Sequence, residues 1–342
     1  MVTWESFSAS ESDSAWNNLL LQAIDYTVFQ SYGWGEYKRH AGWIPLRYVA
    51  RNKSGKVLGM VQLLLKPLPL GAAMIWAPGG PVLRFNSSDI EFRWGHLTDL
   101  LDDLRNKYPL ALIRFHSHLP SESGLAYEFS RVCRRPFFKI NSGFSIHMNL
   151  LEIGDHFNAT MTSKHRYYVK RAESSGIRWS SGTSESDIHA LLYVHREMIK
   201  NKKMLSIATS EANILNLRNS LGKDGLTILT GFLDDEPVTS CLTLNFGNKS
   251  IYMVAATGKK GRENCAAYAM VTRLIPLLQK KGIEYFDFGG LDPISSNAEG
   301  VNHFKRGFGG QIVEYLGEWE TARNEWVRSG MNLALWKRGG RV

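Results

Sequence analysis

The same order of predicted strands and helices occurs twice along the chain, and this repeat constrains the fold more than any other feature. Each copy has three apolar, β-branched runs, then a segment with leucines at helical spacing, then one more apolar run. In the first half these segments cover residues 46–52, 57–66, 72–78, 89–107 and 110–116. In the second half they cover residues 226–233, 238–246, 250–257, 264–281 and 284–290. The pattern predicts, in each half, a three-stranded antiparallel meander followed by a helix and a further strand.

This repeat predicts an α+β protein built from two similar domains. The two copies keep a nearly constant offset, since Asp234 follows Ser54 by 180 residues and Tyr285 follows Ala111 by 174. A chain of 342 residues is long enough for two domains that each bury a core. The pattern leaves open the alternative of one irregular α+β domain.

Positive charge is concentrated in one part of the chain. The formal net charge is +9, and residues 129–172 contribute +6 of it from eight basic and two acidic side chains. Such a balance favours an anionic partner, but it does not choose among nucleic acid, nucleotide and anionic lipid.

Residues 160–175, inside this basic stretch, have the pattern of a helix that Thr160 or Thr162 caps and Gly176 ends. One face of the helix would carry cations and tyrosines, namely Lys164, Tyr167, Tyr168 and Arg171. Cations interleaved with tyrosines suit phosphate neutralisation and base stacking. The alternative is a solvated helix whose tyrosines pack inward.

The cysteines and the N-terminal residues favour a reducing, cytoplasmic location. The three cysteines lie far apart and lack CxxC spacing, so neither a disulfide framework nor a cysteine metal site is predicted. The first 16 residues are polar and acidic, unlike a secretory signal peptide. The most apolar stretch, residues 60–78, is interrupted by a lysine, prolines and a glycine, so we expect no integral membrane segment.

Several common catalytic motifs are absent from the sequence, including GxSxG, HExxH, Walker A and GxGxxG. His116 and His118 face the same way on a predicted strand, but no third ligand joins them, so we predict no metal site. An acyl-CoA site is an alternative, because a meander, a helix and a strand also form the acetyltransferase core. Residues 257–270 contain two glycines and basic residues, but not the R/Q-x-x-G-x-G/A order with which that core holds a pyrophosphate.

The most specific segment of the sequence is 286–310. A predicted strand ends at Gly289 and Gly290, where the backbone can approach a ligand closely. After a polar loop, Lys305 and Arg306 precede a glycine-rich turn. Two cations beside exposed backbone amides suit a phosphate or a developing oxyanion. The alternative is a glycine turn with both cations in water.

Several segments, in the same order, resemble the FemABX family of aminoacyl-tRNA-dependent transferases that extend peptidoglycan stem peptides. They are SYGWGEYKRHAGW (31–43), LLLKPLPLGAAMIWAPGGPV (63–82), SKHRYYVKRAESSGI (163–177), and YMVAATG, FDFGGLDP and FKRGFGG between residues 252 and 310. The resemblance covers residues 25 to 320 and is to the compact members, since no heptad insertion for a coiled-coil arm lies between Lys164 and Lys202.

The resemblance implies a fold of two tandem acetyltransferase-like (GNAT-like) domains, each a mostly antiparallel mixed sheet flanked by helices. On this basis we expect an N-terminal domain at residues 1–150, a C-terminal domain at 151–320 and a C-terminal helix at 321–342. We also expect a monomer.

The resemblance also implies roles for individual residues. Lys38 and Lys202 would pair with the diphosphate of a uridine-nucleotide-linked acceptor, and lysine at 202 replaces the arginine that is frequent in the family. Phe304 and Lys305 would lie at the acyl-transfer centre, where the amide that joins them and the Lys305 side chain stabilise negative charge. Further expected substrate-binding residues are Trp34, Tyr252, Gly289, Gly290 and Arg306. Expected tRNA-binding residues are Lys164, Arg166, Tyr168, Lys170 and Arg171.

The activity that the resemblance implies is transfer of an amino acid from aminoacyl-tRNA to an amine of a peptidoglycan precursor, with a UDP-linked or lipid-linked muropeptide as acceptor. The ester is already activated, so no cofactor is expected, and DNA is not an expected partner. His116 stands where some members carry an acid proposed as a base, so no protein general base is assigned. The alternatives are a CoA-dependent N-acyltransferase, a tRNA-dependent enzyme of peptide natural-product biosynthesis, and a non-catalytic RNA-binding module.

Overall fold

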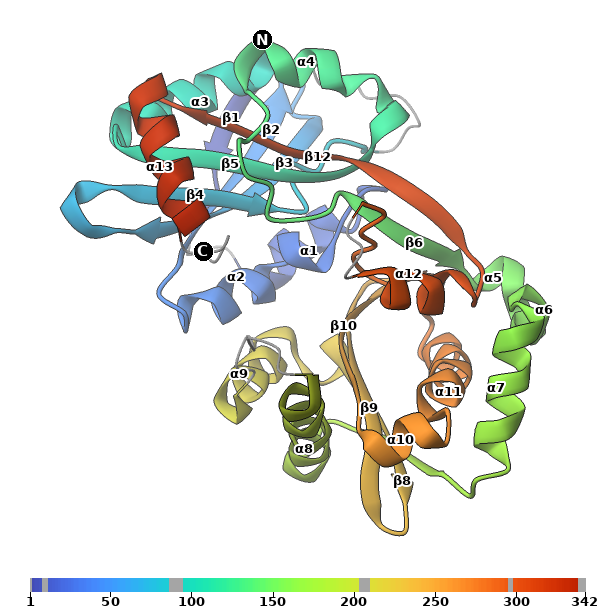
Figure 1. Ribbon diagram of the computed structural model, residues 1–342. Helices are drawn as coiled ribbons and strands as arrows, with labels where there is room; N and C mark the ends of the chain where they lie inside the picture. The colour runs from blue at the N-terminus through green and yellow to red at the C-terminus, as the bar shows by residue number, and fades with distance from the viewer. Residues whose placement is uncertain (1, 8–11, 86–94, 203–209, 295–297, 338–342) are drawn as a thin grey trace. The chain divides into compact units, whose positions relative to one another are not determined.

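The computed structural model describes the chain except for residues 1, 8–11, 86–94, 203–209, 295–297 and 338–342 (Figure 1). The side chains of residues 201 and 202 also lie outside the description. The chain divides into two compact units: unit 1 comprises Met1–Gly143 and Glu314–Val342, and unit 2 comprises Phe144–Val313. Each unit has its own hydrophobic core.

The strands of unit 1 follow the spatial order β1-β2-β3-β4-β5-β12. They are β1 (Val2–Ser6), β2 (Ile44–Asn52), β3 (Val57–Pro67), β4 (Ala73–Pro78), β5 (Ala111–Pro120) and β12 (Gln311–Ala322). The strands β2, β3 and β4 form an antiparallel meander, whereas β4 and β5 are parallel. A parallel pair needs a crossover connection, which contains α3 (Gly95–Lys107), and the apolar stripe of α3 is buried in the core of unit 1.

The other described helices of unit 1 are α1 (Asp13–Leu20), η1 (Val28–Gln30), α2 (Tyr32–Arg39), η2 (Pro69–Gly71), η3 (Ser121–Ser123), α4 (Leu125–Val132) and α13 (Glu325–Lys337). Helix α2 begins where the Ser31 hydroxyl accepts a hydrogen bond from the Trp34 N–H at 3.2 Å. This cap fixes the start of the helix that carries Lys38.

The strands of unit 2 follow the order β6-β11-β10-β9-β8-β7. They are β6 (Phe144–Asn149), β7 (Arg178–Gly182), β8 (Leu226–Leu233), β9 (Glu236–Phe246), β10 (Lys249–Thr257) and β11 (Tyr285–Asp287). The strands β7 to β10 pair antiparallel, β10 and β11 pair in parallel, and β11 pairs antiparallel with β6. Helix α11 (Ala266–Lys280) lies in the crossover between the parallel strands, as α3 does in unit 1.

The other described helices of unit 2 are α5 (Leu150–Ile153), η4 (Gly154–His156), α6 (Phe157–Thr160), α7 (Ser163–Glu173), α8 (Glu185–Lys202), α9 (Glu211–Leu221), η5 (Lys223–Gly225), α10 (Lys259–Glu263) and α12 (Glu299–Arg306). No helix in the described part of the chain combines the length and apolar character that a membrane span requires.

The predicted α+β class, with a mostly antiparallel mixed sheet flanked by helices, is confirmed. Local details differ from the sequence pattern. The predicted helix 264–281 is observed as α11, Ala266–Lys280, which begins directly after Cys265, a residue in the left-handed conformation with φ of 54°. A short helix that the sequence pattern did not predict, α10, precedes it. The first residues of the predicted helix 89–107 lie outside the described residues, and α3 is described from Gly95.

The boundaries between the two compact units differ from the expected domain limits at residues 150 and 320. The first segment of unit 1 ends at Gly143, and its second segment begins at Glu314. The second segment belongs to unit 1 because β12 pairs antiparallel with β5 and is followed by α13. Within the expected C-terminal helix at 321–342, helix α13 covers Glu325–Lys337.

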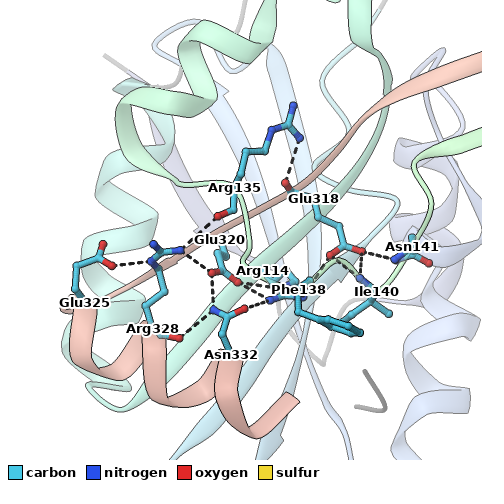
Figure 2. A network of polar contacts seen from close by, with 10 residues as sticks. All are labelled: Arg114, Arg135, Phe138, Ile140, Asn141, Glu318, Glu320, Glu325, Arg328 and Asn332. Carbon is cyan, nitrogen blue, oxygen red and sulfur yellow. Dashed lines mark hydrogen bonds and ion pairs between the residues drawn. The ribbon is translucent and has the colours of Figure 1, made fainter. Parts of the chain in front are cut away.

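A buried polar network joins β5, β12 and α13 in unit 1 (Figure 2). The Glu320 carboxylate accepts hydrogen bonds from Arg114 Nη2 at 2.5 Å, Arg328 Nη1 at 2.9 Å and Asn332 Nδ2 at 2.6 Å. Arg114 also lies 3.3 Å from Glu318, whose carboxylate accepts from the Ile140 N–H at 3.0 Å. Charges without water must be paired and fully hydrogen-bonded, and this network meets that requirement.

The network predicts a strong dependence of unit 1 on Glu320. Replacing Glu320 by Ala leaves the fully buried Arg114 and the nearly buried Arg328 without their shared carboxylate, so we expect the free energy of unfolding to fall by about 3–5 kcal/mol. Urea denaturation measures this change.

The matched control for this experiment is Glu325→Ala. Glu325 pairs with Arg328 at 2.8 Å, but its side chain is 68% exposed, so we expect a loss of only about 0–1 kcal/mol. Equal losses in the two variants would contradict the role of burial.

Candidate functional site

Lys305 is a buried cation near the end of α12. Its residue is 9% exposed, and its Nζ donates to the carbonyl oxygens of Gly290 at 2.7 Å and Gly289 at 3.2 Å. An ammonium group has three protons, so one N–H remains after these two bonds. The alternative with Lys305 in water does not hold, whereas Arg306, the next residue, is exposed.

The turn that holds Lys305 depends on glycine at position 289. Gly289 has φ of 70°, and a Cβ there would lie 2.9 Å from the carbonyl oxygen of Tyr252 on β10. Both the conformation and the space therefore favour glycine. The carbonyls of Gly289 and Gly290 face the Lys305 ammonium, so the expected substrate-binding glycines act here as lysine acceptors.

Asp287, at the end of β11, fixes the same turn. Its Oδ1 accepts from the Gly289 N–H at 2.7 Å and from the Ser145 hydroxyl, and its Oδ2 lies 3.4 Å from Nε2 of His147. Burial alone would raise the pKa of Asp287, but the contacts with His147, Ser145 and the Gly289 N–H lower it to about 2. The carboxylate is therefore ionised near neutral pH, although sequence reasoning did not select it.

The charge of Lys305 results from two opposing effects. Burial lowers the pKa of Lys305 below its ordinary value of 10.5, and the negative charge of Asp287 raises it. The backbone N–H of Lys305 is not free in the same way as the side chain. Lys305 is the seventh residue of α12, and helical geometry directs its N–H to the carbonyl four residues earlier. The side chain is thus better placed than the expected backbone amide to donate to an oxyanion.

Phe304 lies in an aromatic cluster of unit 2. Its ring centroid is 5.2 Å from that of Tyr268 and 5.0 Å from that of Phe308. Its carbonyl oxygen lies 2.9 Å from Nε2 of His165, a buried residue of α7. Phe304 and Lys305 are therefore held by the cluster on one side and by the Gly289–Gly290 turn on the other.

Tyr252, an expected substrate-binding residue, has its ring in the interior of unit 2. The ring lies 6.1 Å from Phe286 and 5.8 Å from Phe288, between centroids. Burial and the neighbouring Cys241 thiol raise the pKa of Tyr252 well above 10. Its backbone carbonyl, rather than its hydroxyl, approaches the Gly289 turn.

Helix α7 separates its cations from its apolar residues. The basic residues expected to bind tRNA are all exposed, and they are Lys164, Arg166, Lys170 and Arg171. Within the described part of the chain none of these four forms a salt bridge. The inner face carries His165, Val169 and Ala172, which are buried.

The two neighbouring tyrosines of α7 have different environments. Tyr167 is 62% exposed, whereas Tyr168 is half-buried with its ring 4.7 Å from that of Tyr268. The inward-packing alternative therefore applies to Tyr168, and Tyr167 is the exposed aromatic residue on this helix. Thr162, not Thr160, caps α7 by accepting from the His165 N–H at 3.3 Å.

Lys38 lies among aromatic rings in unit 1. Its Nζ is 5.3 Å from the Trp34 ring centroid and 5.9 Å from that of Trp76. Burial, together with the nearby charge of Lys66, lowers the pKa of Lys38. The indole N–H groups of Trp34 and Trp76 are buried and have no hydrogen-bond partner among the described residues.

A half-buried cation beside a second cation suits an anionic ligand. Among the described residues Lys38 has no carboxylate within salt-bridge distance. Lys202, its expected partner, is the last residue of α8, and its side chain lies outside the described residues.

His116 occupies the position considered for a base, and it is buried in unit 1. Burial lowers its pKa to about 4, so it is neutral near pH 7. Its ring lies 4.7 Å from that of His118, between centroids, and His118 stacks on Tyr315 at 4.5 Å. The described residues contain no group of three or more His, Cys, Asp or Glu side chains that would hold a metal ion.

Residues 227–333 match a protein-family model, that of the FemAB family. This match runs from β8 to α13 and includes the Lys305 site. No curated protein matches the chain at a significant level.

Solved structures with the same fold are similar over nearly the whole chain. The structure described as FemX has a TM-score of 0.79 and 15% sequence identity, and the match covers 96% of this chain and 100% of that chain. A tandem GNAT protein from the clavulanic acid biosynthesis pathway has a TM-score of 0.58 and 12% identity, with coverage of 95% and 99%.

A third similar structure is the C-terminal domain of a putative lysylphosphatidylglycerol synthetase from Agrobacterium fabrum. It has a TM-score of 0.57 and 11% identity, with coverage of 94% of this chain and 96% of that chain. The family match and the shared fold confirm the resemblance to FemABX and the acetyltransferase-like architecture.

The site predicts that Asp287 sets the protonation of Lys305. Replacing Asp287 by Asn removes the negative charge that raises the pKa of Lys305, so we expect that pKa to fall further. The measurement is the pH dependence of Lys305 acylation by an amine-reactive reagent, read by peptide mass spectrometry. The midpoint should move to lower pH, because only the neutral amine reacts.

The control variant is Asp155→Asn, which removes an exposed carboxylate in the same unit. Its Lys305 labelling profile should match that of the unmodified chain. An unshifted midpoint in Asp287→Asn would rule out the electrostatic coupling.

Proposed function

We propose that this chain is a member of the FemABX family and transfers an aminoacyl group from aminoacyl-tRNA to an amine of a peptidoglycan precursor stem peptide. The observation that carries the proposal is the buried Lys305 ammonium, which two backbone carbonyls orient and which keeps one N–H for an incoming group. Because the donor is charged tRNA, the proposed reaction takes place in the cytoplasm. The enzyme would thus form peptide bonds without a ribosome and build interpeptide bridges.

The proposed chemistry is aminolysis of an ester. The acceptor amine attacks the ester carbonyl carbon, a C–N bond forms, and the C–O bond to the tRNA ribose breaks. The amine loses a proton and the ribose oxygen gains one, so the transfer is balanced without a metal or redox cofactor. Lys305 Nζ would donate to the developing negative charge on the carbonyl or ribose oxygen.

The proposed donor-binding surface is the outer face of α7. Its four exposed cations, Lys164, Arg166, Lys170 and Arg171, carry charge that no salt bridge neutralises within the described residues, although Arg166 and Arg171 also donate to backbone carbonyls. Tyr167 adds an exposed ring for stacking, whereas Tyr168 supports the helix from inside.

The proposed acceptor site in unit 1 uses Lys38. A diphosphate would neutralise the half-buried Lys38 ammonium, which lies over the rings of Trp34 and Trp76. Lys66 lies close enough to lower the pKa of Lys38 and would add a second positive charge. By the family resemblance, Lys202 and Arg306 of unit 2 are also proposed to bind substrate. The uridine-nucleotide-linked and lipid-linked precursors share this diphosphate.

The CoA-dependent alternative is less well supported by the loop before α11. Glu197 Oε1 accepts from the Lys259 N–H at 2.8 Å, and its Oε2 would lie 2.1 Å from a Cβ on Gly258. A carboxylate therefore occupies one of the backbone donors that would hold a pyrophosphate, and it would repel that anion. A tRNA-dependent enzyme that builds a peptide natural product would use the same donor chemistry and differ in its acceptor.

The first test of the proposed function is Lys305→Ala. We expect the rate of aminoacyl transfer from a charged tRNA pool to UDP-linked muropeptide to fall by about 100-fold or more, because a donor to the oxyanion is lost. Mass spectrometry of the acceptor measures the product. Lys223→Ala removes an exposed lysine of the same unit and should transfer at the unmodified rate. A normal rate in Lys305→Ala would refute the catalytic assignment.

The second test reverses the charge of the four α7 cations. Replacement of Lys164, Arg166, Lys170 and Arg171 by Glu should raise the KM for charged tRNA by about tenfold or more and make it less sensitive to salt. Steady-state kinetics at several salt concentrations measure both effects. The control variant reverses the charge of four exposed lysines that are distant in sequence from α7, namely Lys53, Lys56, Lys107 and Lys223. If both reversals have the same effect, α7 is not the specific donor surface.

A further inference from the structure

The last turn of α12 leaves one carbonyl without its helical donor. The Phe308 N–H, four residues after Phe304, donates to the Lys305 carbonyl at 3.3 Å instead. The Phe304 carbonyl therefore needs another donor, as the last carbonyls of a helix do. Nε2 of His165 supplies it at 2.9 Å.

The contacts of His165 fix its tautomer. A carbonyl oxygen accepts only, so Nε2 must carry the proton, and Nδ1 of the neutral ring then accepts from the Thr162 hydroxyl at 3.0 Å. Burial is the largest effect on the pKa of His165 and lowers it, which favours this neutral form. Both ring nitrogens of a residue that is 1% exposed are therefore bonded.

The chain around His165 holds α12 by further bonds. The Thr162 N–H donates to the Gly307 carbonyl at 2.9 Å, and the Thr160 hydroxyl donates to the Phe308 carbonyl at 2.8 Å. Gly307 allows the close approach, since a Cβ there would lie 1.8 Å from Cε1 of His165. The start of α7 and the end of α12 thus form one rigid contact.

His165 lies opposite the contact that holds the Lys305 side chain. The peptide group between Phe304 and Lys305 is bound by His165 through its carbonyl, while the ammonium is bound by the Gly289 and Gly290 carbonyls. Two separate attachments therefore fix the backbone and the tip of the same lysine. Apolar packing of α7 does not need such a bond, because Val169 and Ala172 already fill its inner face.

We propose that His165 is a positioning residue for aminoacyl transfer, which holds the Phe304–Lys305 peptide so that Lys305 faces the ester carbonyl. The inference rests on the proposed function and extends it. His165 stands between Lys164 and Arg166 in the sequence, so the helix that offers cations to the tRNA outside also orients the catalytic lysine inside. His165 itself touches neither substrate.

The kinetic test compares three variants with the unmodified chain. His165→Leu removes the donor and keeps a side chain of similar bulk, so kcat should fall by about tenfold while the KM for acceptor stays within about twofold. His165→Gln retains an N–H near the Nε2 position and should recover most of kcat. His156→Leu makes the same change at an exposed histidine of unit 2 and should leave kcat unchanged.

A second measurement does not depend on activity. Hydrogen exchange followed by mass spectrometry should show about tenfold faster exchange over residues 304–310 in His165→Leu, with β8 and β9 unchanged, and normal exchange in His165→Gln. Unchanged exchange in His165→Leu, or a Gln variant that behaves like the Leu variant, would overturn the positioning role.

The two measurements separate the inference from the proposed function. If the unmodified chain transfers amino acids and His165→Leu has the same kcat, the positioning role is overturned and the proposed function stands. If no charged tRNA supports transfer by the unmodified chain, the proposed function fails, and with it the positioning role in catalysis, while the exchange data still report how His165 holds α12.

Discussion

The cost of removing a charged side chain from water is the constraint on which much of this structure depends. In unit 1, Arg114 is fully buried and is compensated by the carboxylates of Glu318 and Glu320, so that β5, β12 and α13 are held together by a complete set of bonds (Figure 2). In unit 2, the buried Lys305 ammonium donates hydrogen bonds to two backbone carbonyls. The Asp287 carboxylate, which is farther away, favours the charged form of Lys305. Arg114 is therefore neutralised by carboxylates that contact it directly, whereas Lys305 is not.

The sequence predicted the fold well because its signals are local. Apolar runs bounded by turns identified the strands, and the leucines of residues 97–104 identified the buried stripe of α3. Predictions were less accurate where the backbone conformation depends on a single residue. The short helix α10 was not predicted, and Cys265, with φ of 54°, separates it from α11 although nothing in its residue type indicates such a conformation.

The candidate site was only partly accessible from the sequence, because its decisive contacts join distant segments. The motif around Lys305 was recognised, but its acceptors are 15 and 16 residues away and its electrostatic partner is on β11. His165 was one of ten scattered histidines, and its bond spans 139 residues. Helical spacing placed Tyr167 and Tyr168 on one face of α7, but the packing of Tyr268 draws only Tyr168 inward.

The buried and half-buried cations can be divided into structural and functional ones by asking which group neutralises their charge. A protein retains an unpaired buried charge at a cost, so such a charge is favoured where a ligand supplies the missing partner. Arg114 has its carboxylates in the chain, and an added anion would gain nothing there. Lys38 and Lys305 have no carboxylate within salt-bridge distance among the described residues, and the indole N–H groups near Lys38 are unpaired as well. In each unit, the cation without a carboxylate partner is the place where an anion or a developing negative charge would contribute most to binding or catalysis.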